Sequence, residues 1–117
     1  MVTIPHLTSA RTYSRYAREA VTLLGSLIRV NRIERRLSVQ ALAERVGISR
    51  DMMQRIEQGD PRCGIGLVIE AATIVGVPLF GTDSSNKLTM HIKEQEDKLR
   101  LLPKAIHKTR AAVKDDF

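Results

Sequence analysis

Residues 39–58 hold two short helical segments separated by a three-residue turn that contains Gly47, and no other part of the chain restricts the fold as strongly. The first segment places apolar side chains at positions i, i+3, i+4 and i+7, which is the spacing of one helix face. Its members are Val39, Leu42, Ala43 and Val46. Gly47 can take the left-handed conformation at the end of this helix, and Ser49 stands where the next helix needs an N-cap. The pattern predicts two helices of about eight residues that meet across a tight turn.

The rest of the chain has helical periodicity and turn residues, without the alternation that predicts strands. We expect a first helix over residues 14–35, a fourth that starts at Gly64 or Gly66 and ends at Gly76, and an amphipathic helix over residues 87–100. The fold class is therefore all-α. The residues expected to face or cover the core outside the two short helices are Ala17, Val21, Leu24, Ile28, Ile33, Ile65, Val68, Ile69, Ala72, Val75, Leu79 and Phe80.

The same turn residues divide the chain into three parts. We expect residues 1–13 to form a flexible basic arm, residues 14–82 a compact domain, and residues 83–117 a helical, basic extension. In the extension, six basic residues and no acidic residue lie between Lys98 and Lys114. This run could contact DNA phosphates or an acidic partner, or it could be a solvated tail.

The extension also carries candidate partner-binding residues. Leu88, Ile92 and Leu99 form an apolar stripe that has no partner within the predicted domain. Such a stripe favours dimerisation or the docking of another protein. Phe117, which follows two aspartates, could anchor in a protein groove or could belong to a disordered end.

Charge and residue usage narrow the possible functions. The 117 residues carry 19 Lys+Arg against 13 Asp+Glu, for a net charge of +6, which favours a polyanionic partner over an acidic small substrate. Cys63 is the single cysteine, and the three histidines lie too far apart to hold zinc. No nucleophile is paired with a base and no glycine-rich phosphate loop follows a strand, so we expect neither an enzyme nor a cofactor. The absence of a long apolar run or an export signal predicts a cytoplasmic protein without a membrane segment.

The two short helices have the residues that a helix-turn-helix requires. Ala43 must be small because the second helix crosses close to it, Gly47 must reverse the chain, and Ile48 and Ile56 lock the two helices together. The second helix gathers its polar residues on one arc, which fits the major groove of DNA. There Arg suits guanine, Gln suits adenine, and Asp can accept from cytosine. The base-reading candidates are Arg50, Asp51, Arg55 and, less directly, Gln54. For a helix standing alone, a solvated polar face would be the preferred interpretation.

Residues 24–80 resemble the Cro and phage-repressor (XRE) family of helix-turn-helix proteins, through the pattern of Arg32, Ala43, Gly47, Ile56, Glu57 and Gly59. The resemblance implies a five-helix, lambda-repressor-like domain whose third helix reads DNA. It also implies a scaffold ion pair between Arg32 and Glu57.

Candidate phosphate contacts lie at the starts of the two short helices, where backbone N–H groups face outward. They are Ser38, Gln40 and Ser49. The sequence departs from the family pattern in two places. The usual Gln falls at Val39, so that Gln40 is one place late, and Arg36 stands where a glycine is common. Arg36 could adopt an ordinary turn and add a basic phosphate contact.

A narrower resemblance, to HipB-like antitoxins, is carried by residues 54–61, the helix start at Gly64-Ile-Gly66, residues 77–81 and the ending 113–117. It implies a homodimer that binds a palindromic operator, represses its own operon and holds a HipA-like serine/threonine kinase inactive at the bacterial nucleoid. Two alternatives remain at this point. The chain could be a free-standing XRE-family regulator, or an interaction module that inhibits a kinase and whose DNA binding is vestigial.

Overall fold

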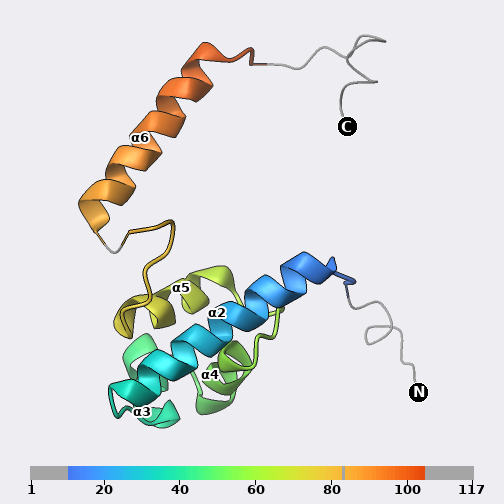
Figure 1. Cartoon of the computed structure of the whole chain (residues 1–117), viewed down its shortest axis with the longest axis vertical. Helices are drawn as coiled ribbons and strands as arrows, with labels where there is room; N and C mark the ends of the chain where they lie inside the picture. The colour runs from blue at the N-terminus through green and yellow to red at the C-terminus, as the bar shows by residue number, and fades with distance from the viewer. Residues whose placement is uncertain (1–10, 83, 105–117) are drawn as a thin grey trace. The chain divides into compact units, whose positions relative to one another are not determined.

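The structure of the chain is a computed structural model that describes residues 11–82 and 84–104. The chain divides into two compact units, Met1–Asp83 and Ser84–Phe117. The described helices are α2 (Arg15–Glu34), α3 (Val39–Val46), α4 (Arg50–Glu57) and α5 (Ile65–Ile74) in the first unit and α6 (Ser85–Leu101) in the second (Figure 1). Apart from one isolated bridge between Leu79 and Thr82, the described backbone is helical, turning or irregular, which confirms the all-α class.

Serine side chains define where the helices of the motif begin. The Ser38 hydroxyl accepts a hydrogen bond of 3.0 Å from the N–H of Ala41, and the Ser49 hydroxyl accepts one of 3.1 Å from the N–H of Met52. Ser14 caps α2 in the same way. Each cap satisfies a backbone donor that the first turn of a helix would leave without a partner.

The ends of α2, α4 and α5 share one hydrogen-bonded motif. The second residue after each helix has a positive φ, and the N–H of the residue that follows it donates to a carbonyl in the last turn of the helix. These residues are Arg36 (φ 58°), Gly59 (78°) and Gly76 (80°). The returning bonds run from Leu37 to Arg32 (3.1 Å), from Asp60 to Arg55 (3.0 Å) and from Val77 to Ala72 (2.8 Å). Arg36 is therefore left-handed, so the ordinary turn that the sequence allowed does not form.

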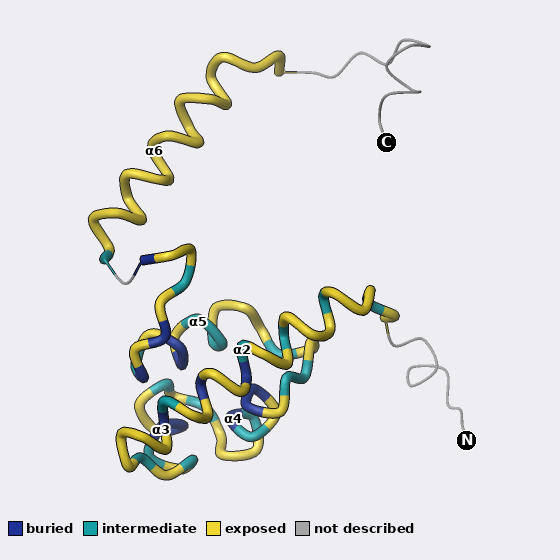
Figure 2. The backbone as a smooth tube through the Cα atoms, in the orientation of Figure 1, coloured by how far each residue is buried: buried dark blue, intermediate teal, exposed yellow. Residues whose placement is uncertain are grey.

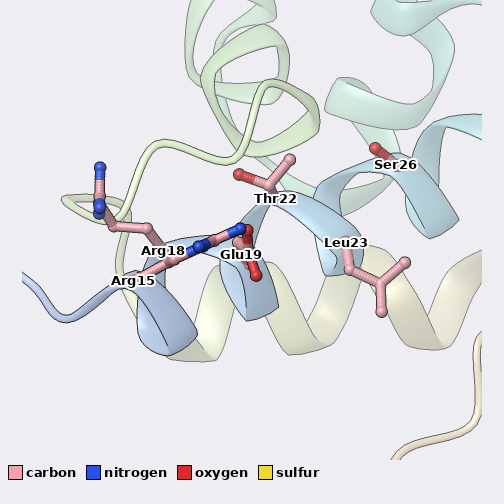
Figure 3. A pocket seen from close by; sticks show the side chains of 6 residues that line it. All are labelled: Arg15, Arg18, Glu19, Thr22, Leu23 and Ser26. Carbon is pink, nitrogen blue, oxygen red and sulfur yellow. The ribbon is translucent and has the colours of Figure 1, made fainter.

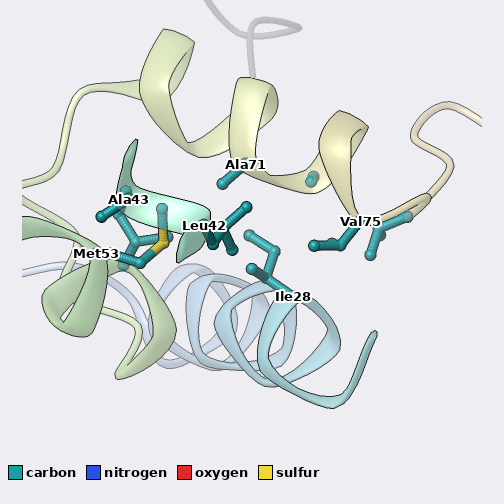
Figure 4. Close-up of a cluster of buried hydrophobic side chains, with 9 residues drawn as sticks. Ile28, Leu42, Ala43, Met53, Ala71 and Val75 are labelled. Atoms are coloured by element: carbon teal, nitrogen blue, oxygen red, sulfur yellow. The ribbon is translucent and has the colours of Figure 1, made fainter. Parts of the chain in front are cut away.

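The hydrophobic core of the first unit lies where its described helices meet. α3 packs against α4 and α5, and α2 packs against the same two helices. Ile28, Leu42, Met53 and Val75 are fully buried, and they come from four different segments (Figure 4). Figure 2 shows the buried positions on the inward sides of these helices. The small residues Ala43, Ala71 and Ala72 complete the contact and allow the helix axes to approach closely.

Three expected core residues lie at the surface instead. Ile33 is 53% exposed because the inward place on the last turn of α2 is taken by Arg32. Ile65 is 76% exposed because it is the first residue of α5, and helical side chains point back toward the N-terminus, beyond the helix end. Phe80 is 81% exposed. Its φ of 56° and that of Gly81, 73°, are typical of the two central residues of a tight type I′ turn, whose side chains point outward.

The helix α6 is described by itself. It has no buried residue, and its apolar side chains are 37% exposed at Leu88, 59% at Ile92 and 67% at Leu99. None of the helices in the described part of the chain is long and apolar enough to cross a lipid bilayer.

Candidate nucleic-acid interface

The turn between α3 and α4 is held by one carbonyl. The N–H groups of Gly47 and Ile48 both donate to the oxygen of Ala43, at 2.8 and 3.0 Å, and Gly47 has a φ of 88°. Ala43 is completely buried beneath the turn, and Ile56 of α4 is 2% exposed. Ile48 is half-buried against the same core. These residues lie at and beneath the turn, where the sequence predicts a scaffold role for them.

A buried ion pair connects α2 to the end of α4. Arg32 Nε lies 2.6 Å from Glu57 Oε2 and Arg32 Nη2 lies 3.0 Å from Oε1, so the contact is bidentate. The two side chains are only 10% and 6% exposed. Arg32 Nη1 also donates to the carbonyl of Leu37 at 2.8 Å, which fastens the loop before α3 to the same group. A buried pair with satisfied donors fixes geometry, and losing one partner typically costs about 3–5 kcal/mol.

The backbones of α2 and α4 also approach each other closely, and the sequence did not predict this contact. A Cβ on Gly25 of α2 would lie 2.5 Å from the carbonyl oxygen of Ile56 and 2.8 Å from that of Glu57. A Cβ on Gly59 would lie 2.7 Å from the Cα of Thr22. α4 can therefore rest on α2 only because both glycines lack a side chain. A glycine within an otherwise regular helix, with no turn to explain it, was the available signal.

α4 presents its polar arc to solvent. Met53 and Ile56 lie in the core, whereas Arg50, Asp51 and Arg55 are exposed and Gln54 is half-buried. The four base-reading candidates therefore share a rigid helix of eight residues whose opposite side is fixed. Exposed guanidinium and amide groups on such a helix can reach the edges of base pairs in a major groove.

The four phosphate candidates are all exposed. Ser38 and Ser49 cap α3 and α4, so their hydroxyls already accept backbone bonds while the remaining first-turn N–H groups face outward. Gln40 Nε2 donates to Glu44 Oε2 at 3.1 Å, and its amide would have to leave this carboxylate to reach a phosphate. Arg36 is exposed in the loop between α2 and α3.

The sequence also did not predict an ion pair that lies just after α4. Arg62 donates from Nε and Nη2 to the two carboxylate oxygens of Asp60, at 3.0 and 2.9 Å, and its backbone N–H adds a bond of 2.9 Å. These bonds from the Arg62 side chain and backbone lower the pKa of Asp60 to about 2. With Met52, Arg55 and Cys63, the pair lines a hollow of about 160 Å³ next to the polar arc. The signal was an acid and a base two residues apart across Pro61.

The remaining candidate residues lie outside α3 and α4 in the sequence. Burial raises the pKa of the Cys63 thiol, which disfavours the nucleophilic thiolate. Among residues 11–82 and 84–104, no group of three acidic, His or Cys side chains could hold a metal ion. In the predicted N-terminal arm, the Arg11 guanidinium lies 5.6 Å from the Tyr13 ring centre. Leu88, Ile92 and Leu99 are exposed on α6, and Phe117 lies outside the described residues.

The sequence pattern of a protein family described as a helix-turn-helix domain matches residues 23–81, just over half of the chain. The matched segment begins within α2, includes α3, α4 and α5, and ends at residue 81, between the two bridge residues Leu79 and Thr82. No curated protein matches the chain, and no solved structure matches it.

Proposed function

Since the chain belongs to the helix-turn-helix domain family, we propose that it is a sequence-specific, dimeric transcriptional repressor whose α4 enters the major groove of double-stranded DNA. The observation that carries this proposal is the contrast between the two sides of α4. One side is held against α2 by a buried ion pair and by the close approach at Gly25. The other side exposes Arg50, Asp51 and Arg55. A reading element needs this combination because base contacts are sensitive to small displacements.

In this role the residues divide into two groups. Arg50, Asp51, Gln54 and Arg55 read base edges, and the groups at the starts of α3 and α4, together with Arg36, contact phosphates. Two copies related by a two-fold axis would bind a palindromic operator with half-sites about one helical turn apart. The net charge of +6 supports attraction to DNA but carries no sequence preference.

Replacing Arg55 with alanine tests the base-reading role. We expect Arg55→Ala to lose about 1–3 kcal/mol of preference at one base pair of an operator selected with the wild-type protein. The measurement is the ratio of affinities for the operator and for random DNA, at fixed salt. Arg36→Ala is the matched control, because losing a phosphate contact should weaken both affinities equally and reduce the salt dependence. An unchanged affinity ratio for Arg55→Ala would remove the base-reading role.

We further propose that the repressor is a HipB-like antitoxin that controls its own operon and neutralises a HipA-like kinase in the bacterial cytoplasm. The resemblance of residues 54–61 and 77–81 supports this assignment, as does the exposure of Leu88, Ile92 and Leu99 on α6. The test is co-expression with a HipA-like serine/threonine kinase. A stoichiometric complex in which the kinase is inactive supports the antitoxin, whereas operator binding without such a complex leaves a free-standing regulator. Kinase inhibition without operator affinity would indicate an interaction module whose DNA binding is vestigial.

A further inference from the structure

α2 carries apolar side chains on two opposite faces. Its inward face carries Gly25, Ile28 and Arg32, all buried. At about 100° per residue, the side opposite these residues carries a second apolar row, which we call the outer stripe. Its members, with their exposed fractions, are Tyr16 (84%), Leu23 (60%), Leu27 (40%) and Val30 (50%), and Ile33 (53%) lies at its edge. The solvent face of a surface helix is normally polar, so a continuous apolar stripe there marks a contact with another surface.

The charges beside the outer stripe are arranged for self-pairing. Two copies of α2 can pack side by side and antiparallel, related by a two-fold axis that lies between them. We place this axis level with the midpoint between residues 24 and 25. Glu19 and Arg29 lie on the same flank of the stripe at nearly equal distances from the axis, so that each carboxylate faces a guanidinium of the other copy. In a parallel pair, Glu19 would face Glu19 and Arg29 would face Arg29, which costs free energy.

The surface beside Leu23 is hollow where the antiparallel arrangement needs room. A depression of about 620 Å³ is lined by six residues of α2: Arg15, Arg18, Glu19, Thr22, Leu23 and Ser26 (Figure 3). Leu23 and Ser26 lie at equal distances on either side of the same axis. Leu23 of one copy would therefore enter the space beside the small Ser26 of the other copy, in the manner of a knob entering a hole.

We propose that the outer stripe of α2 is the homodimer contact, in which two copies pack antiparallel with Leu23 against Ser26 and Glu19 paired to Arg29. The occupant of this surface is a second copy of the chain, because two antiparallel copies place Leu23 in the hollow beside Ser26 and bring Glu19 within reach of Arg29. The inference rests on the dimeric state in the proposed function and names the surface that produces it. Glu19 already bonds Arg15 at 3.1 Å within one helix, so pairing adds a second cation to this carboxylate.

The experiment is the mass of the full-length chain in solution without DNA, measured by sedimentation over a range of concentrations. We expect a dimer for the wild type and at least about a hundredfold weaker association for Leu23→Glu, because each dimer loses two apolar contacts and gains two buried charges. Ile92→Glu on α6 is the matched control, since Ile92 is 59% exposed and Leu23 is 60% exposed. This control should stay dimeric. A monomeric wild type, or dissociation by Ile92→Glu and not by Leu23→Glu, would overturn the proposal.

A charge exchange tests the orientation without placing a charge in the apolar contact. Glu19→Arg and Arg29→Glu should each weaken the dimer about three- to tenfold, and the double variant should recover most of the loss. Circular dichroism checks that α2 remains helical in each variant. Failure of the double variant to recover would overturn the antiparallel contact. Because these measurements contain no DNA, an intact dimer that binds no operator would count against the proposed function and leave this contact standing.

Discussion

Arg36 occupies a backbone position that glycine takes after α4 and α5. Its φ of 58° is left-handed, and its N–H donates to the carbonyl of Ile33 at 2.9 Å in the motif that ends α2. A side chain in this conformation crowds the following carbonyl and costs roughly 1–2 kcal/mol, a cost that glycine avoids. The phosphate contact that we propose for Arg36 would be a functional reason to retain this strain.

Exchanging Arg36 for glycine separates stability from DNA affinity. We expect Arg36→Gly to raise the free energy of unfolding by about 1 kcal/mol, and Arg36→Ala to leave it nearly unchanged, because alanine keeps the Cβ that causes the strain. Urea unfolding measures both values. Each variant should lose the same DNA affinity, since each lacks the guanidinium. Equal stability of the two variants would show that the backbone at this position carries no strain.

Individual residues were predictable where their role shows in local spacing. Ser14, Ser38 and Ser49 precede helical patterns directly, and Gly47 follows one, so the bounds of α2, α3 and α4 expected from the sequence agree with the structure to within about a residue. Residues whose role depends on a distant neighbour were not predictable in this way. Asp60 and Arg62 were passed over as part of a turn, and only the folded loop brings their side chains together.

At the scale of helices, the position of α4 depends on how closely α2 allows it to approach. The carbonyls of Ile56 and Glu57 lie over Gly25, in the same turn where Glu57 bonds Arg32. Helical periodicity alone does not identify this contact, because Gly25 satisfies no apolar pattern. The outer stripe was missed for a related reason. Once one face of α2 is assigned to the core, its remaining apolar residues are expected to be incidental surface positions.

A methyl group at Gly25 should clash with the backbone of α4 and force α2 and α4 apart. Alanine favours a helix by about 1 kcal/mol over glycine, but its Cβ would lie 2.5 Å from a backbone oxygen that cannot move without α4. We therefore expect Gly25→Ala to be destabilising by about 1–3 kcal/mol in urea unfolding, with a loss of operator affinity. Gly66→Ala is the control, because nothing lies within 4 Å of a Cβ at that helical position. It should be neutral or stabilising. A stabilised Gly25→Ala variant would mean that the helices do not approach this closely.

At the scale of the whole molecule, the family match ends at residue 81 and the first compact unit ends at residue 83, so α6 lies beyond both. The sequence predicted the helix and its apolar stripe from local periodicity. It could not specify a partner for the stripe, since an amphipathic pattern shows that a face is suited to burial without identifying the surface that covers it. Two exposed apolar stripes, on α2 and α6, are consistent with one contact between copies and another to a different protein.

Replacing Ile92 with glutamine tests whether the apolar stripe of α6 binds a partner protein. Because Ile92 is 59% exposed, we expect Ile92→Gln to change the free energy of unfolding by less than about 0.5 kcal/mol, and to leave the dimer and operator affinity intact. Binding of a HipA-like kinase should weaken about tenfold, as for an apolar anchor at an interface. Lys93→Gln, its exposed neighbour, controls for the amide and should bind the kinase normally. Unfolding midpoints, sedimentation and kinase titration measure these effects. A stability loss above about 1 kcal/mol would place Ile92 in a buried contact within the folded protein and would contradict a free docking surface.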